Sequence, residues 1–298
     1  MQYSGELAAL GAAYCWSWTA IFFTAAGTRI GSFSVNVIRL AMAVILLGST
    51  TVLLMGTNVP GWYAGGSIPI LFLSGVIGLA LGDAALFRAL LLIGPRKTML
   101  IFASSPIITS IIGWGLLREI LSLQSWVAIA ITIAGIVFVI SERSGTGFKI
   151  KKGNTKIGIV IALLAALGQS VGLILSKIGM ADHVDPLPAT LLRIFSGMLV
   201  LYTYMFINKK TNLIAKSLTN GKALLFVFGG SVFGPFAGVW LSVTAVRYTE
   251  TGIASTLMSM VPIMILPAAM VIYKERLTLR TIIGTVIAVS GIAMLFLR

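Results

Sequence analysis

Long apolar stretches follow one another along the whole chain, separated by short polar segments. A helix needs roughly 20 consecutive apolar residues to cross the hydrocarbon core of a bilayer. The pattern therefore predicts an all-α, polytopic membrane protein with ten transmembrane helices. The expected spans are 7–27, 33–55, 67–93, 97–117, 124–141, 157–179, 187–207, 222–246, 252–273 and 279–297.

The composition excludes a water-soluble globule. Of the 298 residues, 58% are hydrophobic and 10% are charged, whereas a soluble domain carries about 25% charged residues. The first span is too long for a cleavable signal peptide, and the segment before it, MQYSGE, is acidic rather than basic. One cysteine, Cys15, excludes an intramolecular disulfide, and we expect no metal site.

The two halves of the chain repeat each other. Ser74, Gly78 and Gly82 recur as Gly230, Gly234 and Gly238, at a constant offset of 156 residues. The same offset relates the other matching positions, which are Pro106 and Pro262, Glu119 and Glu275, and Gly135 and Gly291. Each unit holds five spans, so the second must enter the membrane from the opposite side. We therefore expect two inverted five-helix repeats, residues 1–141 and 157–298, joined by a basic linker, 142–156.

Small residues and prolines predict how these spans pack. Each trio is spaced by four residues and lines one helix face, which favours close helix packing over substrate contact. Pro106 and Pro262 fall inside the fourth and ninth expected spans. There each removes a backbone hydrogen bond, and the resulting bend is either a static kink or a hinge.

The repeat ends carry a resemblance to a known family. The stretches LLREILSLQSWVAIAITIAGIVFVI and IYKERLTLRTIIGTVIAVSGIAMLFL, with paired arginines Arg39 and Arg193 and small-rich third and eighth spans, resemble the EamA-type transporters of the drug/metabolite transporter superfamily. The resemblance covers nearly the whole chain. It implies transport of small metabolites, amino acids or drugs, often as export, through a central cavity between the repeats. Asp83 departs from the family pattern, where an aromatic residue is usual.

Five charged residues lie inside expected spans: Arg39, Asp83, Arg88, Lys177 and Arg193. A charge at the bilayer centre costs several kcal/mol, so each needs a partner or a function. Asp83 and Arg88 are separated by about 140° around a helix and do not pair with each other. We expect Asp83 to pair with Arg39 or Arg193, either as a fixed clamp or as part of substrate or proton handling. The matched placement of the two arginines in both repeats favours a shared structural or gating role over substrate recognition. Arg88 and Lys177, nearer to helix ends, are expected to snorkel to the headgroups, and the alternative for Lys177 is that it attracts an anionic group at the mouth of the cavity.

Polar and aromatic residues on several spans are candidates for the cavity lining. Single serines are discounted because they often bond only their own backbone, and we expect Glu119 to form an interfacial ion pair or to cap the helix that follows it. The substrate-binding candidates are Trp16, Ser17, Asp83, Phe87, Ser104, Ser105, Gln169, Ser170, Trp240, Thr244, Met258 and Ser259.

The charge distribution predicts an orientation. Three basic residues lie on one side of the expected topology: Arg118, Arg247 and Arg298. Fifteen lie in or beside the odd-numbered loops: Arg29, Arg96, Lys97, Arg143, Lys149, Lys151, Lys152, Lys156, Lys209, Lys210, Lys216, Lys222, Lys274, Arg276 and Arg280. The positive-inside rule places these loops in the cytoplasm and both termini outside, whereas many superfamily relatives are thought to have cytoplasmic termini.

These features together predict a secondary-active transporter, and an exporter in particular, of small metabolites such as amino acids. There is no phosphate-binding loop for ATP, and we expect neither enzymatic activity nor a cofactor. A lipid-linked carrier or flippase is the alternative, and a channel comes third. The expected partners are the bilayer of the cell (inner) membrane and a small solute, with no nucleic acid. A monomer is the simplest expectation, although the sequence leaves the oligomeric state open.

Overall fold

The computed structural model of the protein describes residues 3–56, 67–141, 155–181, 184–265, 267–268 and 278–297. Most of these residues lie in helices, and none of them lies in a strand, which confirms the all-α expectation. The first repeat contains α1 (Ser4–Ile30), α2 (Ser32–Met55), α3 (Ser67–Gly75), η1 (Val76–Gly82), α4 (Asp83–Phe102), α5 (Ser105–Leu117) and α6 (Leu123–Ile140). The second contains α7 (Thr155–Met180), α8 (Pro186–Ile207), α9 (Thr211–Leu218), α10 (Gly221–Ser231), η2 (Val232–Gly238), α11 (Val239–Tyr248), α12 (Thr251–Met258), α13 (Val261–Met264) and α15 (Leu279–Phe296).

Eight helical stretches in the described part of the chain are long and apolar enough to cross a membrane. The fourth and ninth expected spans instead yield shorter apolar helices, Ser105–Leu117 and Thr251–Met264. The expected count of ten transmembrane helices is therefore not confirmed within the described residues. Residues 94–96, predicted as a loop, lie within α4, which continues to Phe102. This stretch includes Pro95. A proline is tolerated inside a membrane helix where neighbouring groups satisfy the freed carbonyl.

The two prolines mark helix starts rather than bends in continuous helices. Pro106 lies in the first turn of α5, after a turn at Ala103 and Ser104. Pro262 lies in the first turn of α13, after a turn at Ser259 and Met260. Proline suits this position, where its missing N–H would have no helical acceptor. The helices are therefore interrupted for two residues that keep right-handed helical torsions, at matching places in both repeats.

Element boundaries repeat at the offset read from the sequence. The π-helical segments η1 and η2 begin 156 residues apart, at Val76 and Val232, and α6 and α15 are likewise displaced by 156. Single-turn π segments inside helices often occur at functional sites. Asp83 directly follows η1, and the offset places Val239 at the matching position after η2. The repeats thus share a backbone plan but differ in charge at this point.

Matching helices run in opposite directions. Gln124, at the start of α6, donates a hydrogen bond to the carbonyl of Met294 near the end of α15. Phe33, at the start of α2, packs edge-to-face on Tyr204 near the end of α8. Because the start of one helix meets the end of its counterpart in each case, the inverted relation predicted from the odd number of spans is confirmed.

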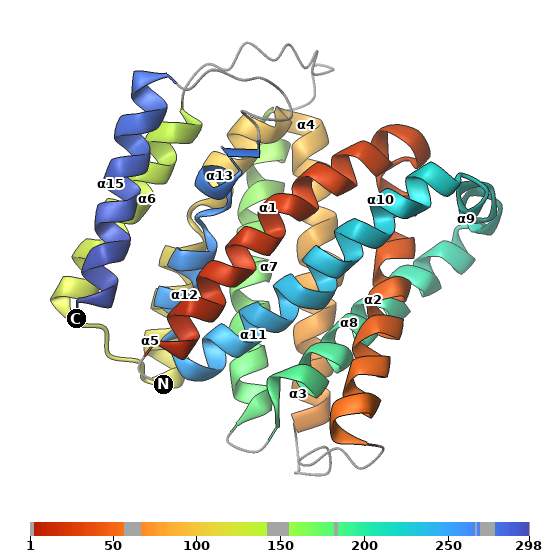
Figure 1. Cartoon of the computed structure of the whole chain (residues 1–298), viewed down its shortest axis with the longest axis horizontal. Helices are drawn as coiled ribbons and strands as arrows, with labels where there is room; N and C mark the ends of the chain where they lie inside the picture. Colours follow the sequence, from red (N-terminus) through yellow and green to blue (C-terminus); the bar gives the residue numbers. More distant parts are fainter. Residues whose placement is uncertain are drawn as a thin grey trace.

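The repeats interlock instead of packing side by side. In Figure 1, α6 and α15 form a pair at one side of the molecule, next to the main bundle. Within the bundle, α1 packs along α10, η2 and α11, and its counterpart α7 packs along α3, η1 and α4. The fourth and ninth spans also meet, through α5 and α12. Most helix contacts therefore join one repeat to the other.

The two glycine trios form different interfaces. A Cβ built on Gly172 of α7 would lie 2.8 Å from the Cα of Gly78, so these two backbones are in direct contact. Ser74 donates to the Gly172 carbonyl at 2.6 Å. In the other repeat, a Cβ on Gly238 would meet the Trp16 ring at 2.6 Å. The expected packing role is confirmed, but one trio packs against a helix backbone and the other against the Phe23, Thr19 and Trp16 side chains.

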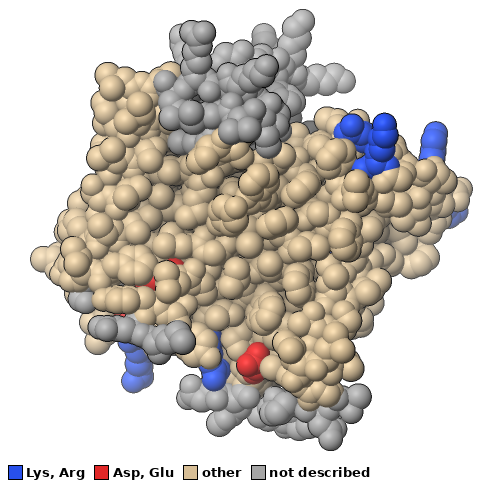
Figure 2. All heavy atoms as spheres, in the orientation of Figure 1, with Lys and Arg blue, Asp and Glu red and all other residues tan. Residues whose placement is uncertain are grey.

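Charged side chains gather at two opposite ends of the face shown in Figure 2, and the band between them is almost free of charge. Large exposed apolar side chains such as Ile45, Leu53 and Val286 are 70%, 83% and 60% exposed. An apolar belt of this kind is typical of a lipid-facing surface. At one end lies the short helix α9, which the sequence did not predict, with basic residues in it and beside it: Lys209, Lys210, Lys216 and Lys222.

Candidate functional site

Asp83 and Arg39 form an ion pair inside the bundle. Nη2 of Arg39 donates to Oδ2 of Asp83 at 2.5 Å, and Nε donates to Oδ1 of Asn36 at 2.8 Å. The Phe23 and Phe87 rings lie 5.5 and 5.7 Å from the guanidinium carbon of Arg39, within the range of cation–π attraction. The structure thus selects Arg39 from the two arginines expected as partners, and it adds an amide and two rings.

Arg193 lies on α8 and is only 2% exposed. Its Nη2 lies 3.6 Å from the position that a Cβ on Gly78 would take, so the guanidinium faces η1. Among the described residues, none accepts a hydrogen bond from its Nε or Nη1. Asp83 interacts with it electrostatically. We call Arg39, Asp83 and Arg193 the arginine centre.

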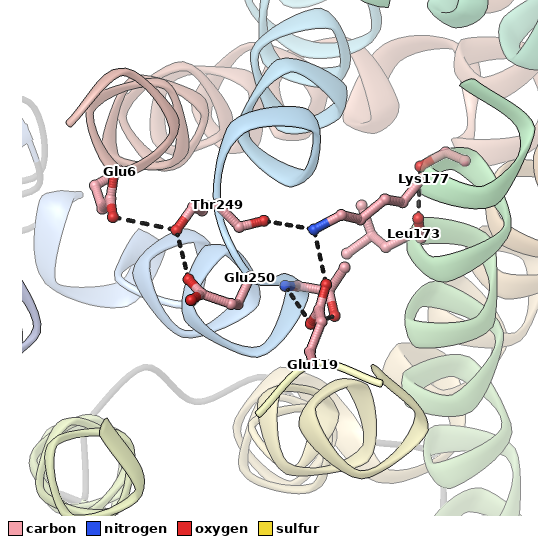
Figure 3. Close-up of polar contacts among 8 residues, drawn as sticks. Glu6, Glu119, Leu173, Lys177, Thr249 and Glu250 are labelled. Atoms are coloured by element: carbon pink, nitrogen blue, oxygen red, sulfur yellow. Dashed lines mark hydrogen bonds and ion pairs between the residues drawn. The ribbon is translucent and has the colours of Figure 1, made fainter. Parts of the chain in front are cut away.

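A second polar site lies at one end of the bundle, and Figure 3 shows its contacts. Nζ of Lys177, near the end of α7, donates to Oε1 of Glu119 at 2.7 Å and to the carbonyl of Thr249 at 2.8 Å. Oε2 of Glu119 accepts from the backbone N–H of Thr251 at 2.9 Å and from its hydroxyl at 2.7 Å. A carboxylate at a helix N-terminus is favoured by the helix dipole. Glu119 therefore caps α12 of the second repeat.

Two further carboxylates extend this site. The hydroxyl of Thr249 lies 3.1 Å from Oε1 of Glu6 and 3.2 Å from Oε2 of Glu250. Glu6 is buried at the start of α1, so the site joins α1, α7 and the segments after α5 and α11. We call these residues the terminal cluster; its members are Glu6, Glu119, Lys177, Thr249, Glu250 and Thr251.

The structure selects among the alternatives expected for Lys177 and Glu119, because the two residues form an ion pair. Lys177 does not extend away to the headgroups, because Glu119 and the Thr249 carbonyl hold its ammonium group. Glu119 forms the expected ion pair, but it does not cap the helix that follows it. That helix, α6, is capped by Ser122, whose hydroxyl accepts from the backbone of Ser125. Glu275, at the matching position, lies outside the described residues.

Hydroxyl groups link the three helices α5, α7 and α12. The hydroxyls of Ser105 on α5 and Ser170 on α7 lie 3.1 Å apart, and both residues are buried. Thr109 on α5 donates to Ser255 on α12 at 3.4 Å. Ser105 and Ser170, expected in the cavity lining, thus contact each other.

The remaining candidates are dispersed. Four hydroxyls bond backbone carbonyls of their own helices: Ser17, Ser104, Thr244 and Ser259. Trp240 packs on Phe236 at 6.0 Å, Met258 is buried and Arg88 is exposed. Gln169 is half-buried on α7, and a Cβ on Gly82 would lie 3.5 Å from its backbone nitrogen.

A shallow surface depression is lined by Trp114, Gly115, Arg118 and Ile120, none of which was a candidate. Asn36, Glu6 and Thr249 were missed by the sequence reasoning. Glu6 and Thr249 lie at the ends of spans, where polar residues are common. Asn36 lies three residues before Arg39, one helical turn away, and this spacing was the available signal.

The comparisons with known proteins agree with this architecture. The family model described as the EamA-like transporter family matches residues 3–141 and 156–297, one repeat each. The chain belongs to the EamA-like transporter family. No curated protein matches it. One solved structure, titled only "Crystal structure of protein", matches with a TM-score of 0.78 and 16% sequence identity. The match covers 100% of this chain and 98% of that one. At that identity the likeness shows the fold alone.

Proposed function

We propose that this EamA-like protein is a secondary-active transporter, operating as an exporter, that carries a small metabolite such as an amino acid by alternating access between its two repeats. Inverted repeats of this kind typically place a solute site near the bilayer midplane, between the halves. The proposed location is the cell (inner) membrane.

The observation that carries this proposal is the terminal cluster. Its ion pair, Lys177 with Glu119, and its cap, Glu119 on Thr251, tie segments of both repeats together at one end of the bundle. Side chains rather than continuous backbone make these connections, so the repeats can separate there without unfolding. Breaks at Pro106 and Pro262 provide matched positions at which the fourth and ninth spans can change angle.

The test is counterflow in proteoliposomes. Vesicles preloaded with unlabelled L-phenylalanine should take up radiolabelled L-phenylalanine transiently and saturably, and protein-free vesicles should not. L-tryptophan and L-leucine form the rest of the probe set. Lack of saturable counterflow for all three, together with scrambling of a fluorescent phospholipid above the protein-free rate, would replace this proposal with a lipid carrier.

A further inference from the structure

The repeat has duplicated an arginine but not its counter-ion. Arg39 and Arg193 occupy matching positions on α2 and α8, the second and seventh spans. Asp83 pairs with Arg39, whereas the matching residue of the second repeat is Val239, which is buried and apolar. Arg193 therefore has no carboxylate of its own repeat at the mirrored position.

The local charges do not balance. The arginine centre holds two guanidinium groups and one carboxylate, and Oδ2 of Asp83 already accepts from Arg39 at 2.5 Å. Arg193 is 2% exposed, and no described residue accepts from its Nε or Nη1. An uncompensated buried charge is strongly destabilising. The site therefore favours an additional group that carries a single negative charge and accepts hydrogen bonds.

We propose that Arg193 binds the carboxylate of the transported solute through these unsatisfied donors. This inference rests on the proposed transport function and specifies its substrate class. One excess positive charge matches one carboxylate, whereas a dianion such as phosphate would reverse the imbalance. The Phe23 and Phe87 rings beside Arg39 supply an aromatic wall next to the charges. The substrate class is a small carboxylate with an apolar or aromatic body.

Access to Arg193 requires a change of conformation. Its guanidinium lies against Gly78 of η1, and just before η1 the last residue of α3, Gly75, approaches α8 closely; a Cβ on Gly75 would lie 2.1 Å from the Arg193 carbonyl oxygen. A carboxylate therefore reaches the unsatisfied donors when α8 and η1 separate. A ligand that binds only one conformation shifts the population toward it. Carboxylate binding would thus be coupled to opening between the repeats.

The experiment measures binding, without a gradient, by thermal unfolding of the full chain in detergent. The probes are 3-phenylpropionate and its neutral isostere 3-phenylpropionamide. The acid should raise the melting temperature saturably, and the amide should not. Arg193→Met should weaken the acid response by about tenfold to a hundredfold in apparent affinity, the range expected for losing hydrogen bonds to a charged group. Arg88→Met, at an exposed arginine of α4, is the matched control and should keep the response.

A second readout covers the stability of the variants. Without probe, Arg193→Met should melt at or above the wild-type temperature, because it removes an unpaired buried charge, whereas Arg39→Met should melt lower. Equal responses to acid and amide, an acid response that survives Arg193→Met, or a melting temperature of Arg193→Met below that of Arg39→Met would each overturn the inference. Arg193-dependent binding without counterflow would instead refute the transport function alone.

Discussion

At the scale of single residues, the ion pair of Asp83 with an arginine was the feature easiest to predict from the sequence. A lone carboxylate within an apolar span needs an opposite charge, and two arginines were available in the sequence. Which one it selects was not predictable, because Arg39 and Arg193 occupy equivalent positions in the repeat. The choice depends on how η1 presents Asp83, which is a property of the packed bundle.

Replacing Asp83 tests this pair directly. Asp83→Asn should lower the free energy of unfolding by about 3 kcal/mol or less, at or below the lower limit for breaking a fully buried pair, because the Asp83 side chain is 21% exposed. The double variant Asp83→Asn/Arg39→Met should recover part of that loss. Denaturant titration of the single and double variants in a double-mutant cycle measures the coupling. Additive losses would show that the two residues are independent.

If the arginine centre also takes part in the transport cycle, Asp83→Asn should reduce L-phenylalanine counterflow by more than its loss of stability explains. The comparison is made at a temperature well below the melting point of the variant, with equal amounts of folded protein reconstituted. Wild-type counterflow by Asp83→Asn would identify the pair as a structural clamp.

At the scale of helices, the spacing of small residues predicted packing faces but not their partners. A spacing of four places Gly78 and Gly82 on one face, and likewise Gly234 and Gly238, whatever lies opposite. The structure places a helix backbone against the first pair and the Thr19 and Trp16 side chains against the second. Each proline likewise indicated in the sequence where a span is interrupted. That a new helix starts there depends on the tertiary packing.

The close contact of α7 with η1 gives an element-scale prediction. Gly172→Ala should destabilise the protein by about 1–3 kcal/mol, as expected for overpacking, because its Cβ would lie 2.8 Å from the Gly78 Cα and neither backbone can rotate away. Gly48→Ala on α2, where nothing lies within 4 Å of the added carbon, is the control and should be neutral or slightly stabilising. Both are compared by thermal unfolding, and equal melting temperatures would refute the close contact.

The terminal cluster gives a second prediction at the scale of helices. Glu119→Gln keeps an acceptor for Thr251 but removes the charge that holds Lys177, so a loss of about 1–3 kcal/mol is expected. Lys177→Met should cost a similar amount, whereas Lys216→Met, exposed on α9, should have no effect. The measurement is denaturant unfolding. If Glu119→Gln left the free energy of unfolding unchanged, the terminal cluster would not hold this end of the bundle closed.

At the scale of the whole molecule, the inverted architecture was predictable because the 156-residue offset and an odd span number determine it. The orientation is a separate prediction. Basic residues around α9 and at the end of α1, including Arg29, lie in odd-numbered loops, so a protease-cleavable tag fused after residue 298 should be accessible from outside intact cells. Protection of that tag, with cleavage only after lysis, would reverse the orientation.

The central claim is that the end closed by the terminal cluster must open during transport. A Cβ on Gly113 of α5 would lie 2.5 Å from Oγ1 of Thr251 on α12, close enough for a disulfide between Gly113→Cys and Thr251→Cys. Replacing the single native cysteine by Cys15→Ala leaves only this pair. Oxidation of the double variant in proteoliposomes should stop L-phenylalanine counterflow, and a reductant should restore it, while each single variant responds to neither. Undiminished counterflow by the fully cross-linked protein would contradict alternating access at this end.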